Sequence, residues 1–464
     1  MAKIVVGNGI VATMDEAESV IKNGSVVIEK DRIVAIGKHE DLKKKHRAET
    51  TIDAKGKVVL PGFVNVHTHL PSLFVRGVYG ILVDGLYQVL FPVKKLIRPE
   101  DMYTFGLASC LEAINSGSTT IMETYNHMSQ FAKAAVKSGL RAVLGEQIPE
   151  ADFNKVKNGV YEYLPEQAEE ALDRGVRLVK EWDGKANGRI RTVFAPLAPD
   201  MCTASTYEKV RDAAVKYGKG VTTHIAQSTE ELRQVRRLYG KTSVEHLRDL
   251  GVLNSKLSGA HLIYATESDL QIMKESQSSI LHCPRPYLLS GTTAPLQRWH
   301  EIGLKVGLGT DNVFHSMSET IRTALYGART RAQMEKRPMW WPSHMELLKL
   351  ATIEGARVLG LEKEIGSLEI GKKADLTIFD LQAPHLMPTI DPLSSIVLYA
   401  TGSDIETVII DGRIVKGKGR MLTLDKSKIL SDAQRLTDRI WESFWKAHPD
   451  LKEVWQKQTR VRYR

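Results

Sequence analysis

The feature that most constrains the fold of this chain is a repeated alternation between short apolar runs and amphipathic helical segments. The segment 100–117, after the first run, and the segment 205–218, after the fourth, are typical of the helical parts. Eight strands that are each followed by a helix are characteristic of a (β/α)8 TIM barrel, so we predict an α/β fold of this class. The runs are 62–70, 117–125, 141–148, 190–198, 220–227, 256–265, 278–286 and 305–312.

The two ends of the chain have a different sequence pattern, in which short stretches that favour β-strands are separated by turns. Such stretches fill residues 1–60 and return in 363–425. We predict that they pair into one small β-sandwich domain built from both ends of the chain. The barrel is then expected at 61–362, and a C-terminal helix with a basic tail at 426–464.

Composition narrows the classes of function. The 464 residues suit a large barrel with an accessory domain. The net charge of +9 comes from basic residues interleaved with 55 acidic ones, so we expect no nucleic-acid partner. No apolar stretch is long enough to span a membrane, and the N-terminus lacks the features of a signal peptide. Three cysteines without a CxxC pair predict a reducing, cytoplasmic setting.

The first apolar run contains two histidines, His67 and His69, in the stretch GFVNVHTHL. Residues i and i+2 of a strand point to the same side, so the two imidazoles should share one face. A His-x-His pair alone is a weak motif. A divalent cation would stabilise two neutral imidazoles that converge in an apolar setting.

Further polar residues occur where the other runs end. Barrel enzymes carry their chemistry at the carboxyl ends of the strands, so these residues should meet at one rim. Five histidines in apolar strand contexts, together with an aspartate, indicate a metal site there. The residues at or near the run ends are His67, His69, Glu123, Glu146, His224, Gln227, His261, His282 and Asp311.

These motifs resemble those of the amidohydrolase superfamily. The resemblance rests on PGFVNVHTHL, on the histidines of the fifth and sixth runs, and on GLGTDN, and it extends over almost the whole chain. The most similar branch contains methylthioadenosine/adenosylhomocysteine deaminases, guanine deaminases and triazine hydrolases. The resemblance implies that one divalent ion, usually zinc, is bound by His67, His69, His224 and Asp311. Iron or manganese would fit the same ligands, because geometry and availability decide which metal binds.

The resemblance also implies roles in a reaction. His261 would contact the activated water or the substrate, and two-metal members use a carboxylated lysine that the fourth run lacks. Asp311 would accept a proton from the water, which attacks an electron-poor carbon of a cyclic amidine or heteroaromatic ring. His282 either hydrogen-bonds the substrate or holds its own loop. We expect a small-molecule substrate and a homo-oligomer, either a dimer or a tetramer.

One position departs from the deaminase pattern. The fifth run reads His224-Ile-Ala-Gln227, where deaminases of this branch have His-x-x-Glu with an acid that protonates the ring. An amide cannot deliver a proton, so either Glu123 or Glu146 supplies the acid or the substrate needs no ring protonation. The second case favours another leaving group, such as halide, thiolate, or the product of amide, urea or carbamate opening. A catalytically inactive metal-binding scaffold is the alternative outside enzymes.

The loop after the first run, 71–93, is long and apolar. It is expected to wall the substrate pocket and to favour a flat or apolar substrate over a highly charged one.

Overall fold

The computed structural model describes residues 3–79, 86–156 and 158–459 of the chain. Its centre is a barrel of parallel strands, and each of the eight apolar runs contains a barrel strand, as the sequence predicts. The fourth and eighth runs are each broken into two short strands. The barrel strands are β6 (Phe63–His69), β7 (Ser118–Tyr125), β8 (Arg141–Ile148), β9 (Ile190–Thr192), β10 (Ala195–Pro196), β11 (Val221–Ile225), β12 (Leu257–His261), β13 (Ser279–His282), β14 (Lys305–Leu308) and β15 (Asp311–Asn312).

The barrel is closed at both junctions between its two parallel sheets. One sheet has the order β10-β8-β7-β6-β15 and the other β11-β12-β13-β14. Asp311 of β15 pairs with Thr68 of β6, which joins the last run to the first. Phe194 forms a parallel bridge with Val221, which joins the fourth run to the fifth. Closure brings the carboxyl ends of all the barrel strands to one rim.

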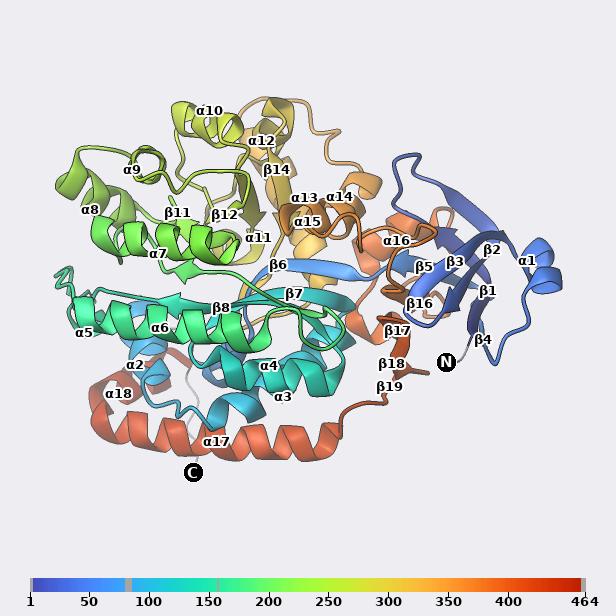
Figure 1. Ribbon diagram of the computed structural model, residues 1–464, viewed down its shortest axis with the longest axis horizontal. Helices are drawn as coiled ribbons and strands as arrows, with labels where there is room; N and C mark the ends of the chain where they lie inside the picture. The colour runs from blue at the N-terminus through green and yellow to red at the C-terminus, as the bar shows by residue number, and fades with distance from the viewer. Residues whose placement is uncertain (1–2, 80–85, 157, 460–464) are drawn as a thin grey trace.

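Helices follow the barrel strands and surround them (Figure 1). Side-chain caps start many of them: Thr203, Ser228, Thr242 and Thr266 each accept a hydrogen bond from a first-turn backbone N–H. These helices are α3 (Asp101–Asn115), α4 (Met128–Ser138), α6 (Pro165–Trp182), α7 (Ala204–Tyr217), α8 (Thr229–Tyr239), α9 (Ser243–Asp249), α10 (Glu267–Glu275), α11 (Pro284–Leu289), α12 (Leu296–Ile302), α13 (Met317–Met334), α14 (His344–Leu350) and α15 (Ile353–Val358).

Both ends of the chain join in one small β domain, as predicted. Its nine strands form a continuous sheet in the order β19-β18-β17-β16-β5-β1-β2-β3, with β4 beside β1. The sheet curls around an apolar cluster that includes Val6, Ile28 and Leu376, and an Arg32–Lys373 bridge links β3 to the segment before β16. The strands are β1 (Lys3–Ala12), β2 (Val20–Glu29), β3 (Arg32–Lys38), β4 (Thr50–Asp53), β5 (Lys57–Pro61), β16 (Leu376–Asp380), β17 (Ile405–Ile410), β18 (Arg413–Gly417) and β19 (Arg420–Met421).

The last two helices, α17 (Lys426–Ala447) and α18 (Pro449–Thr459), cover the barrel of their own chain (Figure 1). The Trp441 indole N–H donates to the Phe74 carbonyl at 2.6 Å, and Trp455 donates to the Gly77 carbonyl at 3.0 Å. The C-terminal helices therefore support the loop that follows β6. None of the helices in the described residues combines the length and apolar content needed to cross a membrane.

Short elements complete the chain and shape the mouth of the barrel. Three of them, η1, η2 and α2, belong to the apolar loop after β6, of which residues 80–85 lie outside the described residues. The short elements are α1 (His39–Lys45), η1 (Leu70–Val75), η2 (Leu86–Leu90), α2 (Phe91–Lys94), α5 (Phe153–Val156), α16 (Pro392–Tyr399) and η3 (Gly402–Asp404).

Candidate metal centre and substrate cavity

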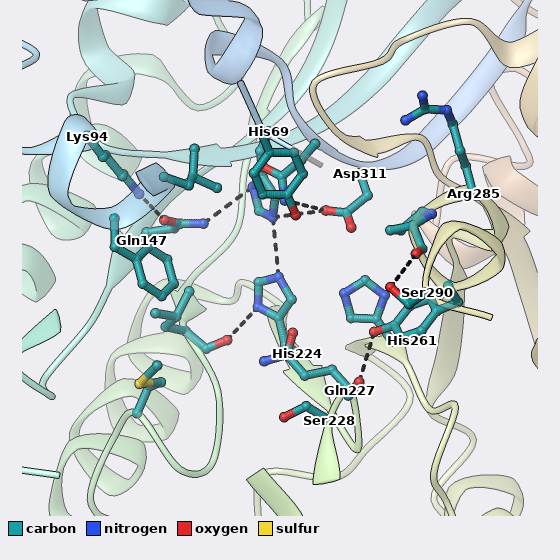
Figure 2. A pocket seen from close by; sticks show the side chains of 18 of the residues that line it. His69, Lys94, Gln147, His224, Gln227, Ser228, His261, Arg285, Ser290 and Asp311 are labelled. Carbon is teal, nitrogen blue, oxygen red and sulfur yellow. Dashed lines mark hydrogen bonds and ion pairs between the residues drawn. The ribbon is translucent and has the colours of Figure 1, made fainter. Parts of the chain in front are cut away.

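Five of the side chains expected at the rim converge on one point. One ligand atom from each of His67, His69 and His224 lies within 4.8 Å of the others, and the same holds for His67, His261 and Asp311. Every one of these side chains is buried. Figure 2 shows His69, His224, His261 and Asp311 directed toward a common centre. The barrel thus unites residues that lie up to 244 positions apart, since β6 pairs with β15 at Thr68 and Asp311.

Two of the histidines are held so that their Nε2 atoms face each other. His69 Nδ1 donates to the Thr124 carbonyl at 2.7 Å, and His224 Nδ1 donates to the Leu197 carbonyl at 2.6 Å. With the proton on Nδ1, each Nε2 carries a lone pair, and the two Nε2 atoms are only 3.2 Å apart. Two lone pairs repel unless a cation lies between them. Metal-bound histidines commonly donate their other N–H to a backbone carbonyl in this way.

His67 and Asp311 complete the arrangement. Neither ring nitrogen of His67 has a hydrogen-bond partner among the described residues, although the side chain is buried. The Asp311 Oδ1 atom lies 3.8 Å from His67 Nε2 and 3.6 Å from His69 Nε2. A buried imidazole without partners is costly, and a bound ion would remove that cost. The donor set therefore fits a divalent ion of the zinc type.

The protonation states of these groups suit a metal site. Burial lowers the pKa of His67, His69 and His261 well below the usual value, and burial lowers the pKa of His224 to about 4. The imidazoles are therefore neutral near pH 7, the form that binds metals. Burial also raises the pKa of Asp311 to about 7, against a backbone hydrogen bond from Asn312. A cation beside that carboxylate would favour its charged form.

The backbone is strained at two of these positions. His261 has φ +83° and Asp311 has φ +62°, in the left-handed region that non-glycine residues seldom adopt. Both residues lie at strand ends, and the unusual dihedrals turn their side chains toward the shared centre. Strain of this kind persists where surrounding structure imposes it, and it is frequent at functional sites.

The cluster forms one wall of a cavity of about 460 Å³. Gln227 also lines it; the Gln227 N–H donates to Glu231 Oε2 at 2.8 Å, and the Tyr287 hydroxyl donates to the Gln227 carbonyl at 3.2 Å. Among the lining residues in the described part of the chain, Asp311 carries the only carboxyl group. The other lining residues are His69, Tyr79, Leu90, Phe91, Lys94, Tyr125, Gln147, Leu197, Met201, His224, Ser228, His261, Arg285, Pro286, Tyr287, Leu289, Ser290 and Asn312.

Three residues expected to contact the substrate do not line this cavity. The Glu123 carboxylate accepts from the Thr68 hydroxyl and the Leu70 N–H, both at 2.7 Å, and so supports the end of β6. The Glu146 carboxylate accepts from the backbone N–H groups that start α4 and from Arg174. The His282 ring meets the ring of Trp299 of α12 edge to face. All three side chains thus contact the outer layer or the strand ends rather than the cavity.

Lys94 is a polar residue at the other side of the cavity that was not predicted from the sequence. Lys94, at the end of α2, is only 7% exposed, and its ammonium donates to the Gln147 Oε1 atom. The same ammonium lies 4.0 Å from the centre of the Tyr125 ring, and Gln147 Nε2 lies 3.4 Å from His69 Nδ1. Burial lowers the pKa of Lys94 to about 7, which Glu146 and Glu123 oppose from a distance. Gln147 is the strand neighbour of Glu146 and faces the opposite side, but the alternation alone does not say which of the two faces the cavity.

The closed (β/α)8 barrel, with a histidine and aspartate cluster at the carboxyl ends of its strands, places this chain among the barrel proteins that carry a metal site. Comparison with known proteins gives the family. The sequence pattern of the amidohydrolase family matches residues 58–415, and the chain belongs to that family.

Individual relatives agree with this assignment along almost the whole chain. A 5'-deoxyadenosine deaminase of Methanosarcina mazei is 35% identical over 446 residues, covering 95% of this chain and 99% of the relative. A 5-methylthioadenosine/S-adenosylhomocysteine deaminase of Pelotomaculum thermopropionicum is 34% identical over 449 residues, with the same coverage of both chains. Among solved structures, an adenosine deaminase from Xanthomonas campestris with bound zinc is similar with a TM-score of 0.85 and 26% identity, covering 95% of this chain and 98% of that one.

Proposed function

We propose that this chain is a metal-dependent aminohydrolase that hydrolyses a C–N bond of a heteroaromatic, adenosine-type ring and releases ammonia. The observation that carries the proposal is the pair of facing Nε2 atoms of His69 and His224, held 3.2 Å apart beside Asp311 in the wall of the cavity. The names of the similar deaminases support the ring chemistry.

In this proposal His67, His69, His224 and Asp311 hold one divalent ion, with zinc favoured by the imidazole and carboxylate set. When bound, such an ion supplies an activated water at neutral pH. Zinc bound in the similar adenosine deaminase supports this choice, and iron or manganese would satisfy the same donor atoms.

The surrounding side chains then have distinct tasks. The Asp311 carboxylate accepts the proton that the attacking water loses and returns a proton to the leaving nitrogen. His261, whose ring stacks on that of His224 with centroids 5.3 Å apart, stabilises the charge that develops on the attacking oxygen. The Gln227 side chain orients the ring by hydrogen bonding. The apolar and aromatic walls, including Phe91 and Leu197, limit access of bulk water to the reacting atoms.

The test combines metal analysis with a substrate panel. We expect about one divalent ion per chain and ammonia release from 5'-deoxyadenosine or 5'-methylthioadenosine that disappears on chelation and returns with zinc. No metal in protein purified without chelators, or turnover that survives chelation, would contradict the proposal. Metal binding without turnover of any ring would instead favour the inactive scaffold.

A second candidate is hydrolysis with another leaving group. The observation that favours it is the amide of Gln227 in a cavity whose described lining offers no acid besides Asp311. A ring with a good leaving group needs less help from a ring-protonating acid. The matched substrates are adenosine and 6-chloropurine riboside, which differ at the reacting carbon. Chloride release at least a hundredfold faster than ammonia release would establish this candidate over the first.

We also propose that the chain works in the cytoplasm and as a homo-oligomer, either a dimer or a tetramer. Cys110, Cys202 and Cys283 are buried free thiols, which supports a reducing compartment. Light scattering on the purified protein tests the assembly.

A further inference from the structure

The cavity contains a buried cation that has no use in the chemistry described above. Lys94 follows directly on the apolar loop after β6, and its side chain is 7% exposed. Its ammonium contacts the Gln147 amide oxygen and the face of the Tyr125 ring. Both partners are neutral. A buried lysine is usually paired with a carboxylate, because removing an ammonium from water is expensive.

Arg285 is the other lysine or arginine among the described residues that line the cavity, and it is paired with a carboxylate. Arg285 lies 3.4 Å from the Glu319 carboxylate and above the ring of Phe314. Lys94, in contrast, forms no ion pair with any carboxylate of the described residues. The two nearby acids are engaged elsewhere, Glu123 with the end of β6 and Glu146 with α4 and Arg174.

The position of Lys94 relative to the metal centre indicates where an anionic partner of its ammonium would lie. In Figure 2, Lys94 and Gln147 lie on one side of the His69 and His224 pair, while Gln227 and Ser290 lie on the other. A ring that reacts beside Asp311 and is oriented by Gln227 would extend its far end toward Lys94. That side of the cavity is otherwise walled by aromatic groups such as Phe91 and Tyr125.

We propose that Lys94 is a specificity-determining residue that pairs with a carboxylate carried by the substrate outside its reacting ring. The proposal rests on the proposed function for the orientation of the ring. One ammonium and the neighbouring Gln147 amide match the charge and the two oxygens of a carboxylate. A dianionic phosphate would leave one negative charge without a partner in this wall.

Two further observations agree with this assignment. Burial lowers the pKa of Lys94 to about 7, and Glu146 and Glu123 offset this only in part, so a carboxylate in contact with the ammonium would favour its charged form. The Lys94 side chain is buried against the Gln147 amide and the Tyr125 ring, so a carboxylate would meet little competition from water for the ammonium.

The test measures equilibrium binding of matched ligand pairs to the metal-loaded enzyme by calorimetry. Inosine-5'-carboxylate and inosine-5'-carboxamide have no ring amino group left to hydrolyse, and they differ only at the 5' group, where one carries an anionic carboxylate and the other a neutral amide. Benzoate and benzamide repeat the comparison without requiring any particular ring. The proteins are wild type, Lys94→Met, Lys94→Arg, and Lys95→Met as control. Lys95 is the next residue, but it is partly exposed and pairs with Asp152 outside the cavity.

We expect wild type to bind the carboxylate of at least one pair about tenfold or more tighter than its amide. Lys94→Met should abolish that preference, Lys94→Arg should retain part of it, and Lys95→Met should keep it whole.

Three results would overturn the proposal: no preference in wild type for either pair, a preference that survives Lys94→Met, or an equal loss of affinity for carboxylate and amide in that variant. The last would mean that Lys94 only supports Gln147. If Lys94→Met unfolds, Lys94→Gln takes its place. Ammonia release is assayed separately, so a carboxylate preference without any ring turnover would contradict the proposed function and leave the Lys94 assignment standing.

Discussion

The two ends of the barrel differ in how their buried charged and polar groups are paired. At the amino ends of the strands, Arg141 at the start of β8 donates two hydrogen bonds to Asp375, at 2.8 and 3.1 Å, with both side chains 2% exposed. Lys373 pairs there with Asp31 and Asp411. At the carboxyl ends, the buried His67 has no hydrogen-bond partner among the described residues, and Lys94 has only neutral ones.

This difference distinguishes buried charged groups that stabilise the fold from buried polar groups that are available to bind a ligand. A buried charge that serves folding must find its partner within the chain, because nothing else will satisfy it. A buried polar group that serves binding can be left for a ligand to satisfy. The amino end therefore joins the barrel to the β domain, while the carboxyl end is organised around groups that the chain itself leaves incomplete. The predictions below test this contrast.

The largest effect is expected at the carboxyl end, from Asp311→Asn. The amide keeps the size of the side chain but cannot accept the proton, so kcat/KM should fall about 1000-fold or more. Circular dichroism should show an unchanged fold. If the variant kept more than a tenth of wild-type kcat/KM, a loss of less than about 1.4 kcal/mol in activation free energy, the assigned role of Asp311 as proton acceptor would be wrong.

Removing ligands should separate metal binding from folding. The double variant His67→Ala/His224→Ala should lose most of the bound metal by elemental analysis. Chelation should lower the Tm of wild type, because an ion that binds the folded state stabilises it, and should leave the Tm of the variant unchanged. Full metal occupancy in the variant would refute the ligand assignment.

At the amino end, Arg141→Met should cost stability rather than chemistry. It leaves the Asp375 carboxylate buried without its partner, and losses of about 3–5 kcal/mol in the free energy of unfolding are typical of such changes. Denaturant unfolding measures this loss, and kcat of the folded fraction should stay near wild type. The double variant Arg141→Met/Asp375→Leu should recover part of the stability. A double variant as unstable as the single one would argue against an unpaired charge as the cause.

A smaller effect is expected from Gln227→Glu. If Gln227 orients the substrate by hydrogen bonding, a carboxylate should impair the native reaction about tenfold, since one hydrogen-bond donor is lost. If the native substrate carries a leaving group other than ammonia, the same variant should gain deaminase activity on rings that require protonation. A tenfold or greater rise in kcat on the native substrate would show instead that the position is an acid site and would remove the orienting role.

The smallest effect is expected from an exposed ion pair, which serves as the reference for Arg141. Lys209 pairs with Glu169 between α7 and α6, and both side chains are about half exposed. Lys209→Met should change the free energy of unfolding by no more than about 1 kcal/mol. A loss as large as that of Arg141→Met would mean that burial does not explain the contrast between the two pairs.

The sequence by itself determined the barrel, the β domain made from both chain ends, and the strand ends at which His67, His69, His224, His261 and Asp311 meet. These features follow from local patterns: apolar runs spaced by helical segments, and polar residues where the runs end. The family resemblance added the proposed ligand roles, and the structure brings the five side chains together.

Only the tertiary structure decided which side of each strand faces the cavity. Glu123, Glu146 and His282 each lie two residues after an outer core residue (Ile121, Leu144 and Ile280), so the pleat turns them away from the centre. On β6 the inner residue Val66 precedes His67, and strict alternation would direct His67 outward. A register shift between Asn65 and Thr68 reverses that alternation.

Long-range contacts also decided the rest of the site. The positive φ angles of His261 and Asp311 are imposed by their surroundings, and nothing in the local sequence marks them. Lys94 is the residue directly after the loop that the sequence indicated as the pocket wall, and only packing against Tyr125 and Gln147 of β7 and β8 brings its ammonium into the cavity. Side-chain direction at a strand end depends on bulges, dihedrals and packing that distant residues impose, whereas the strand itself depends on its own apolar residues.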